Sequence, residues 1–253
     1  MSEHKKVERR GSCFGDEGDD SMKPLVVPFL DSVIHGDCLE VLPRIPESSI
    51  DAVVTDPPFA ITGGLSNGMT SRNDTQFFEH WFTDVARELI RVTKPEGCMF
   101  LWCDWRTVNV IDRAFSRASE RYVPWWVSQV IVHDRDMIGM GSPFRNQCDW
   151  IALVRGQKTD WGDRIPKTTP NIFREYSYYG KHENHPAEKT VSAARRLVEW
   201  AAPEGGVILD PFAGSSTTCV AAREARRMWI GIEREEEHVK TSNKRLAVGT
   251  LAL

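Results

Sequence analysis

The sequence lacks the features that mark several common classes of protein. No apolar run approaches the roughly 18 residues that a membrane span needs, and the first 20 residues have no apolar core of the kind found in secretory signals. C-x-x-C pairs and metal-ligand clusters are also missing among the six cysteines, which stand at positions 13, 38, 98, 103, 148 and 219. We therefore expect a cytoplasmic protein with no membrane segment, no disulfide scaffold and no metal site.

An excess of positive charge is absent as well. The chain has 32 Lys and Arg against 36 Asp and Glu, a formal net charge of −4 and a pI of about 6.0. This composition argues against a histone-like DNA packer, but it is compatible with a nucleic-acid enzyme that has one local basic face. Residues 155–196 contain nine Lys and Arg and only five Asp and Glu, which suggests such a face; the alternative is ordinary solvated surface.

The order of strand and helix signals favours one α/β domain, although 253 residues could also form two small ones. Residues 1–23 are polar and without periodicity, which is typical of a disordered leader, and residues 24–253 are expected to form the domain. Buried-strand patterns alternate with helical spacing, so we predict a doubly wound, mostly parallel sheet. Its strands are expected at 32–34, 50–55, 98–103, 126–133, 150–155, 206–210 and 228–233.

The segment 209–218, L-D-P-F-A-G-S-S-T-T, predicts a strand, a turn of small residues and the start of a helix. Small side chains let the backbone approach a ligand, and a helix N-terminus offers free N–H groups. The next strand ends at Glu233, whose carboxylate is placed to accept hydrogen bonds from both hydroxyls of a ribose. The pattern indicates a nucleoside cofactor, and the missing G-x-G-x-x-G spacing argues against a nicotinamide oxidoreductase. The alternative is a plain strand–helix turn.

A second motif, Asp56-Pro57-Pro58-Phe59, ends a buried strand, because two consecutive prolines cannot donate to a strand ladder. The Asp56 carboxylate and the Pro57 carbonyl supply two acceptors for the N–H groups of a planar amine, and the Phe59 ring supplies a surface on which it can stack. A glycine-rich loop at 60–73 comes next and could serve as a lid. Alone, a D-P-P tripeptide is usually only a turn; its position at a strand end favours a site.

Two weaker segments, Gly36–Leu39 and Asn184–Thr190, complete an ordered set. The set resembles the S-adenosylmethionine-dependent amino DNA methyltransferases of the circularly permuted β class. In that group a D-P-P-[YFW] tetrad comes first, target recognition sits in the middle, and an H-P-x-x-K segment and a D-x-F-x-G-S turn come last. The resemblance extends over about residues 32–248, departs where Phe59 replaces the commoner Tyr, and implies a seven-stranded sheet.

The resemblance implies a role for each motif. The tetrad, residues 56–59, would hold the exocyclic amine of a base flipped out of the duplex. The cofactor, S-adenosylmethionine, would leave as S-adenosylhomocysteine. Asp37 and Cys38 would border its adenine ring or the transfer site, Glu233 would hold its ribose hydroxyls, and its carboxylate would meet His185, Lys189 and Thr190. Its methionine and ribose would lie against the turn residues Asp210, Phe212, Ala213, Gly214, Ser215, Ser216 and Thr217.

The resemblance implies DNA as the partner, and we expect residues at about 156–184 to form a short target-recognition insertion. Basic residues alternate there with aromatic ones, which suits phosphate contacts, although the aromatic side chains could equally pack as core. A homodimer and a separate restriction endonuclease are further expected partners, with methylation alone as the alternative. The residues concerned are Arg155, Lys158, Arg164, Lys167, Arg174 and Lys181, with Trp161, Phe173, Tyr176, Tyr178 and Tyr179.

The first residue of the tetrad indicates the target. Asp at this position favours adenine N6, whereas Ser favours cytosine N4, which stays open as an alternative. Relatives that act on RNA or on protein glutamine usually have Asn there. A non-catalytic DNA-binding module of the same fold is also open, but it predicts a broken tetrad or cofactor turn, and both are intact in this sequence.

Overall fold

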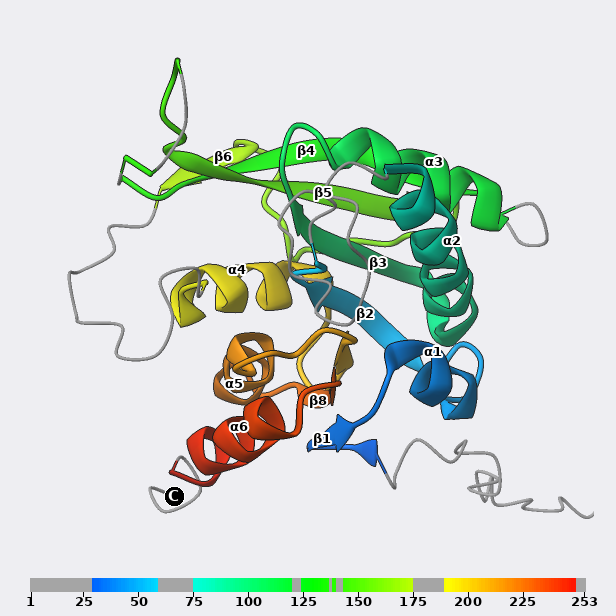
Figure 1. Ribbon diagram of the computed structural model, residues 1–253. Coiled ribbons are helices and arrows are strands. Elements are labelled where there is room, and N and C mark those ends of the chain that lie inside the picture. Colours follow the sequence, from blue (N-terminus) through cyan, green and yellow to red (C-terminus); the bar gives the residue numbers. More distant parts are fainter. Residues whose placement is uncertain are drawn as a thin grey trace, which may run out of the picture.

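The structure is a computed structural model that describes residues 29–58, 75–119, 124–136, 138–139, 143–174 and 189–248. Its centre is an eight-stranded sheet with the order β1-β8-β7-β2-β3-β5-β4-β6 (Figure 1). The strands are β1 (Ser32–His35), β2 (Ile50–Thr55), β3 (Thr93–Cys103), β4 (Trp125–Asp134), β5 (Cys148–Gly156), β6 (Ile172–Arg174), β7 (Val207–Asp210) and β8 (Met228–Glu233).

The sheet divides into a parallel part and a part that contains the antiparallel pairs. From β1 to β3 every neighbouring pair is parallel. β5 runs antiparallel to both β3 and β4, and the short β6 is parallel to β4. A parallel pair needs a crossover, and helices supply those connections.

Helices cover both faces of the sheet, as Figure 1 shows. One face carries α1 (Cys38–Val41), a 3₁₀ turn at Leu42–Arg44, α2 (Thr75–Val92) and α3 (Val108–Ala118). The other face carries α4 (Val191–Ala201), α5 (Thr217–Glu224) and α6 (Glu236–Val248). The arrangement is the doubly wound one that the alternation of elements predicts.

Alternating side chains of the central strands supply two hydrophobic cores. On β3, Met99 and Leu101 face the core under α2 and α3, whereas Phe100 and Trp102 face the core under α4 and α5. All four side chains are buried. Strands that are buried on both faces read as continuous apolar runs, and this explains the uninterrupted C-M-F-L-W-C segment of the sequence.

The predicted fold class is confirmed, with one difference in the number of strands. Among the described residues the sheet has eight strands rather than seven, because Ile172–Arg174 pairs with β4 in a segment for which we predicted no strand. The three-residue length of β6 left no pattern of alternation to detect. The leader, 1–23, and the loop 60–73 lie outside the described residues.

Membrane spans and metal clusters are both missing from the described part of the chain. None of the helices in these ranges combines the length and hydropathy of a membrane span. Among the same residues, no group of three or more His, Cys, Asp and Glu side chains is arranged to hold a metal ion.

Candidate active site

Two strand ends meet at the centre of the parallel part. β2 and β7 pair in parallel, with Ala52 opposite Ile208 and Val53 opposite Leu209. The next helix after β2 is α2, on one face of the sheet, and the next helix after β7 is α5, on the other face. This pair therefore marks the point where the strand order reverses. Ligands of open α/β sheets bind outside the carboxyl ends of the strands at such a point.

Asp210, at the end of β7, is fixed by hydrogen bonds. Its Oδ1 accepts from Thr55 Oγ1 at 2.6 Å and from the Phe212 amide at 3.1 Å. Burial raises the pKa of Asp210 to about 6, although the bonds from Thr55, Phe212 and the Thr218 side chain act in the opposite direction. The carboxylate therefore ties the ends of two strands to the turn after β7.

The turn after Asp210 has an unusual backbone that other elements hold in place. Gly214 has φ of +50°, the left-handed region in which glycine is favoured, and Ser216 has φ of +63°. The Gly214 amide donates to Glu233 Oε2 at 2.8 Å, and Ser242 of α6 donates to the Gly214 carbonyl at 2.9 Å. Arg245 donates to the Ser215 carbonyl at 3.1 Å, so α6 and the end of β8 both fix the turn.

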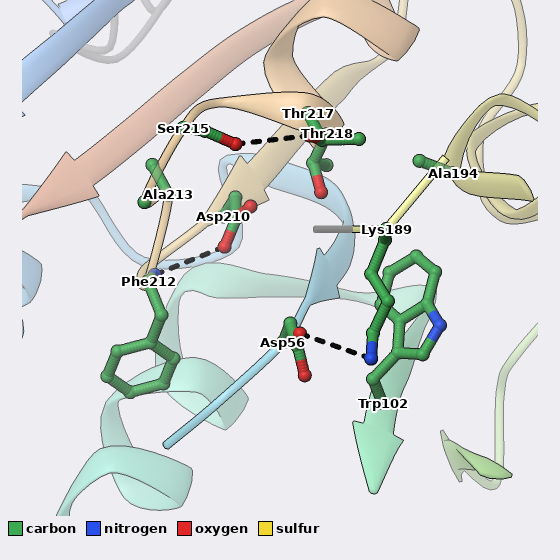
Figure 2. A pocket seen from close by; sticks show the side chains of 11 residues that line it. Asp56, Trp102, Lys189, Ala194, Asp210, Phe212, Ala213, Ser215, Thr217 and Thr218 are labelled. Atoms are coloured by element: carbon green, nitrogen blue, oxygen red, sulfur yellow. Dashed lines mark hydrogen bonds and ion pairs between the residues drawn. The ribbon is translucent and has the colours of Figure 1, made fainter. Parts of the chain in front are cut away.

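A cavity of about 180 Å³ opens between the two strand ends and the start of α4 (Figure 2). Small residues of the turn form one wall, and Trp102 of β3 and Lys189 line the cavity across from them. The lining residues are Asp56, Trp102, Lys189, Ala194, Asp210, Phe212, Ala213, Gly214, Ser215, Thr217 and Thr218.

Asp56 has a carboxylate oxygen in this cavity that no described residue satisfies. Its Oδ2 lies 3.5 Å from Lys189 Nζ, whereas its Oδ1 is buried and meets no donor among the described residues. Burial raises the pKa of Asp56, the Lys189 ammonium opposes this rise, and the nearby Asp149 adds to it. A buried, unpaired carboxylate oxygen is unfavourable unless a ligand supplies the donor.

The chain matches a known protein family over most of its length. Residues 50–244, more than half of it, match the family of DNA methylases that groups N6 and N4 enzymes. The chain belongs to this N6/N4 DNA methylase family. The putative methylase YubD of Escherichia coli strain K12 is 30% identical over 216 residues, which are 85% of this methylase and 89% of YubD. The DNA adenine methyltransferase YhdJ of the same strain is 26% identical over 246 residues, covering 87% and 83% of the two chains.

Solved structures share the fold of the methylase. The M1.HpyAVI–SAM complex superposes with a TM-score of 0.66 at 22% identity and covers 85% of this chain and 98% of that one. The PvuII DNA methyltransferase, described as cytosine-N4-specific, superposes with a TM-score of 0.68 at 20% identity and covers 85% of each chain.

Eight of the predicted site residues of the methylase line one cavity. These are Asp56, Lys189, Asp210, Phe212, Ala213, Gly214, Ser215 and Thr217. Asp56 and Lys189 come from segments far apart in the sequence and lie beside the turn after β7, as Figure 2 shows.

Other predicted residues have structural partners beyond the lining of the cavity. Asp37 caps α1 by accepting from the Leu39 amide at 2.9 Å, and Thr190 caps α4 by accepting from the Ala193 amide at 3.2 Å. Cys38 is buried, and burial raises the pKa of its thiol to about 12. The remaining residues outside the lining are Pro57, Pro58, Ser216, which is the N-cap residue of α5, and Glu233, which accepts from the Gly214 amide. Phe59 and His185 lie outside the described residues.

Sequence reasoning missed several residues of the site. Trp102 and Ala194 line the cavity, but the sequence only indicates that they are core residues. Thr55 directly precedes the tetrad at the end of a predicted strand. A hydrogen bond from its hydroxyl to the end of a neighbouring strand could therefore have been predicted. Asp149 and Arg245 gave no local signal, because their partners come from other elements.

Several side chains of the basic and aromatic segment make contacts within the protein instead of lying open to DNA. Phe173 is buried and stacks on His133, and Trp161 packs near Phe100. Arg174 pairs with Asp134 at 2.6 Å, while Lys158 and Lys167 are exposed. Arg155 lies over the Trp126 ring, Arg164 donates to the Trp200 carbonyl, and Tyr176, Tyr178, Tyr179 and Lys181 lie outside the described residues.

Proposed function

We propose that this protein transfers a methyl group from S-adenosylmethionine to the exocyclic N6 of adenine in DNA. The observation that carries the proposal is Asp56 Oδ1, a buried acceptor without a donor among the described residues, in a cavity built by the turn after β7. An exocyclic amine carries the N–H groups that such an acceptor requires.

The residues around the cavity suit S-adenosylmethionine. Ala213, Gly214 and Ser215 have small side chains and allow close approach of a ligand to the backbone. Glu233 ends the neighbouring strand and could accept the ribose hydroxyls, and the M1.HpyAVI–SAM complex, which has the same fold, supports this cofactor. When bound, the cofactor supplies an electrophilic methyl group on a sulfonium, so the chain itself has no leaving group to activate.

The task of the chain is to make the amine a better nucleophile. The lone pair of adenine N6 is delocalised into the ring. Hydrogen bonds from the amine to Asp56 and to the Pro57 carbonyl draw the nitrogen toward a tetrahedral geometry and localise this pair. The amine nitrogen would form its bond to the methyl carbon as the bond from this carbon to sulfur breaks. The proton that the nitrogen releases would pass to the Asp56 carboxylate, which accepts its hydrogen bond, and then to solvent. Fixed acceptors and positioning account for the catalysis.

The target base must leave the duplex to reach Asp56. We propose that Phe59 stacks on the flipped base and that the loop 60–73 closes over it. We propose a recognition role for residues 156–184 as well, with the exposed Lys158 and Lys167 at phosphates.

Adenine is proposed as the target because Asp occupies the first position of the tetrad. The relative YhdJ, a DNA adenine methyltransferase, supports the same choice. Cytosine N4 is the second candidate, since the PvuII enzyme of the same fold acts there. Both bases present an exocyclic amine, so a single acceptor such as Asp56 would serve either one.

The test is incubation of the protein with methyl-labelled S-adenosylmethionine and genomic DNA, followed by nucleoside analysis. We expect labelled N6-methyladenine in one short sequence motif. N4-methylcytosine would replace the adenine assignment with the cytosine one, and label in RNA or protein alone would refute a DNA substrate. The homodimer and the separate endonuclease stay predictions, which sedimentation and co-purification would test.

A further inference from the structure

Lys189 lies between two carboxylates. Its Nζ is 3.5 Å from Asp56 Oδ2 and 3.6 Å from Asp149 Oδ1. Asp149 belongs to β5, which β3 separates from β2, so the second carboxylate reaches the site from outside the motifs. A charge-assisted N–H···O bond is normally about 2.7–2.9 Å long. Both distances exceed this length, so the ammonium lies at ion-pair distance from both acids and closes on neither of them.

The Asp149 oxygen that does not face Lys189 lies near two other side chains. Its Oδ2 lies 3.6 Å from His133 Nδ1 and 3.8 Å from Arg135 Nε. His133 is only 3% exposed, and its ring stacks on Phe173 with centroids 4.9 Å apart. Burial would raise the pKa of Asp149, but His133, Lys189 and Arg135 together hold it below its ordinary value. The group that pulls on Lys189 is thus an ionised carboxylate with an imidazole and a guanidinium at ion-pair distance from its other oxygen.

We propose that Asp149 is a positioning residue, which by sharing the Lys189 ammonium keeps this cation from capping Asp56 and so leaves Asp56 open to the amine of the substrate. The inference rests on the proposed function. Without Asp149, the ammonium would close on Asp56 as a charge-assisted hydrogen bond. Lys189 would then compete with the substrate amine for the Asp56 carboxylate. In the structure with Asp149 present, the Lys189 ammonium stays farther away and still favours the ionised form of Asp56.

The surroundings of Asp56 predict opposite effects for the two neighbours. Lys189 lowers the pKa of Asp56, whereas burial and Asp149 raise it. Asp210 on β7 and Cys103 on β3 also face this carboxylate, and burial raises the pKa of the Cys103 thiol to about 12, so it is neutral near pH 7. Behind Asp149 stand His133 and Arg135. Removal of Asp149 should therefore lower the pKa of Asp56, and removal of the Lys189 charge should raise it.

The experiment compares Asp149→Asn, Lys189→Gln and the control Asp51→Asn with the wild type. Asp51 lies at the other end of β2 and pairs with Lys94 at 2.7 Å, so the control removes a carboxylate from a similar pair away from the site. The kinetic constants kcat and KM are measured with S-adenosylmethionine and target DNA from pH 5 to pH 9. The titration of Asp56 is followed separately by carboxyl ¹³C NMR without DNA, with the resonance assigned by Asp56→Asn.

We expect Asp149→Asn to lower kcat by about tenfold or more, because misplacement of a group at the reacting centre can cost up to about 10² in rate, with little change in KM for S-adenosylmethionine. The Asp56 midpoint should fall by about one pH unit in this variant and rise by a similar amount in Lys189→Gln. Asp51→Asn should keep the wild-type kcat and midpoint. A purely structural defect would not move the two midpoints in opposite directions.

The conservative variant Asp149→Glu keeps the charge and should restore most of the lost kcat and the wild-type midpoint; it also serves as the test if Asp149→Asn does not fold. An Asp149→Glu protein that folds with a kcat as low as that of Asp149→Asn would contradict the positioning role. An active wild type whose Asp149→Asn variant keeps its kcat and Asp56 midpoint would overturn this inference alone. A wild type that methylates no DNA would instead overturn the proposed function.

Discussion

The ends of the two central strands carry carboxylates that are held in opposite ways. Asp210, after β7, accepts from Thr55 and from the Phe212 amide, and it stabilises the turn around Gly214. Asp56, after β2, has one oxygen at ion-pair distance from Lys189 and another with no donor among the described residues. The strands are direct neighbours, so the difference arises from the residues that come directly after each carboxylate in the chain.

After β7 only one proline follows the acid, and the amide of the next residue, Phe212, donates to the carboxylate. After β2 come two prolines, and neither has an N–H to donate. An amide one or two residues beyond an aspartate commonly satisfies its carboxylate, as Phe212 does for Asp210. The D-P-P sequence prevents this and leaves Asp56 available to a ligand. The comparison thus separates a carboxylate that builds the site from one that is free for chemistry.

The largest effect is expected at Asp56. Asp56→Asn keeps the shape of the side chain but replaces one acceptor oxygen with a donor, so we expect kcat for DNA methylation to fall by about 10³-fold. The Kd for S-adenosylmethionine should stay within about threefold, because binding of the cofactor depends on the turn after β7. Single-turnover kinetics and calorimetry would measure the two quantities. Near-normal turnover in this variant would remove the proposed mechanism.

Asp210 should affect stability and its dependence on pH. The pKa of Asp210 is about 6 in the folded protein against an ordinary value of 3.8. Between these values the unfolded chain has released the proton and the folded chain retains it, so the free energy of unfolding falls as pH rises from about 4 to about 6, by up to about 3 kcal/mol. Asp210→Asn should remove this component. Urea unfolding of both proteins from pH 4 to pH 7.5 would show a difference that changes with pH; parallel curves would contradict the raised pKa.

The smallest effect is expected at Thr55. Thr55→Val preserves the shape but removes the 2.6 Å hydrogen bond to Asp210, which should cost about 1–2 kcal/mol of unfolding free energy. The pKa of Asp210 should rise, because the Thr55 bond lowers it. Thermal unfolding and the pH series above would detect both changes. We expect kcat to fall far less than in Asp56→Asn, and an equal fall would show that the two strand ends do not have separate roles.

Much of this site is predictable from local patterns in the sequence. The D-P-P-F and D-P-F-A-G-S-S segments each contain a strand end and its turn, so the chain alone indicates their position at the carboxyl edge of a parallel sheet. Lys189 is also identified by its motif, but for another role, since the sequence gives no sign that its ammonium reaches Asp56. Phe173 and Trp161 have aromatic side chains that suit either DNA or a core, and the tertiary structure buries or packs them.

The sequence by itself determined the doubly wound class, the two motifs and the chemical character of each, because these depend on residues adjacent in the chain. Only the tertiary structure decided which carboxylate is saturated, that β6 adds an eighth strand, and that Asp149 of β5 shares the ammonium of Lys189. Such contacts join side chains from separate strands. Strand order and pairing fix their distances, and neither is written in any local stretch of sequence.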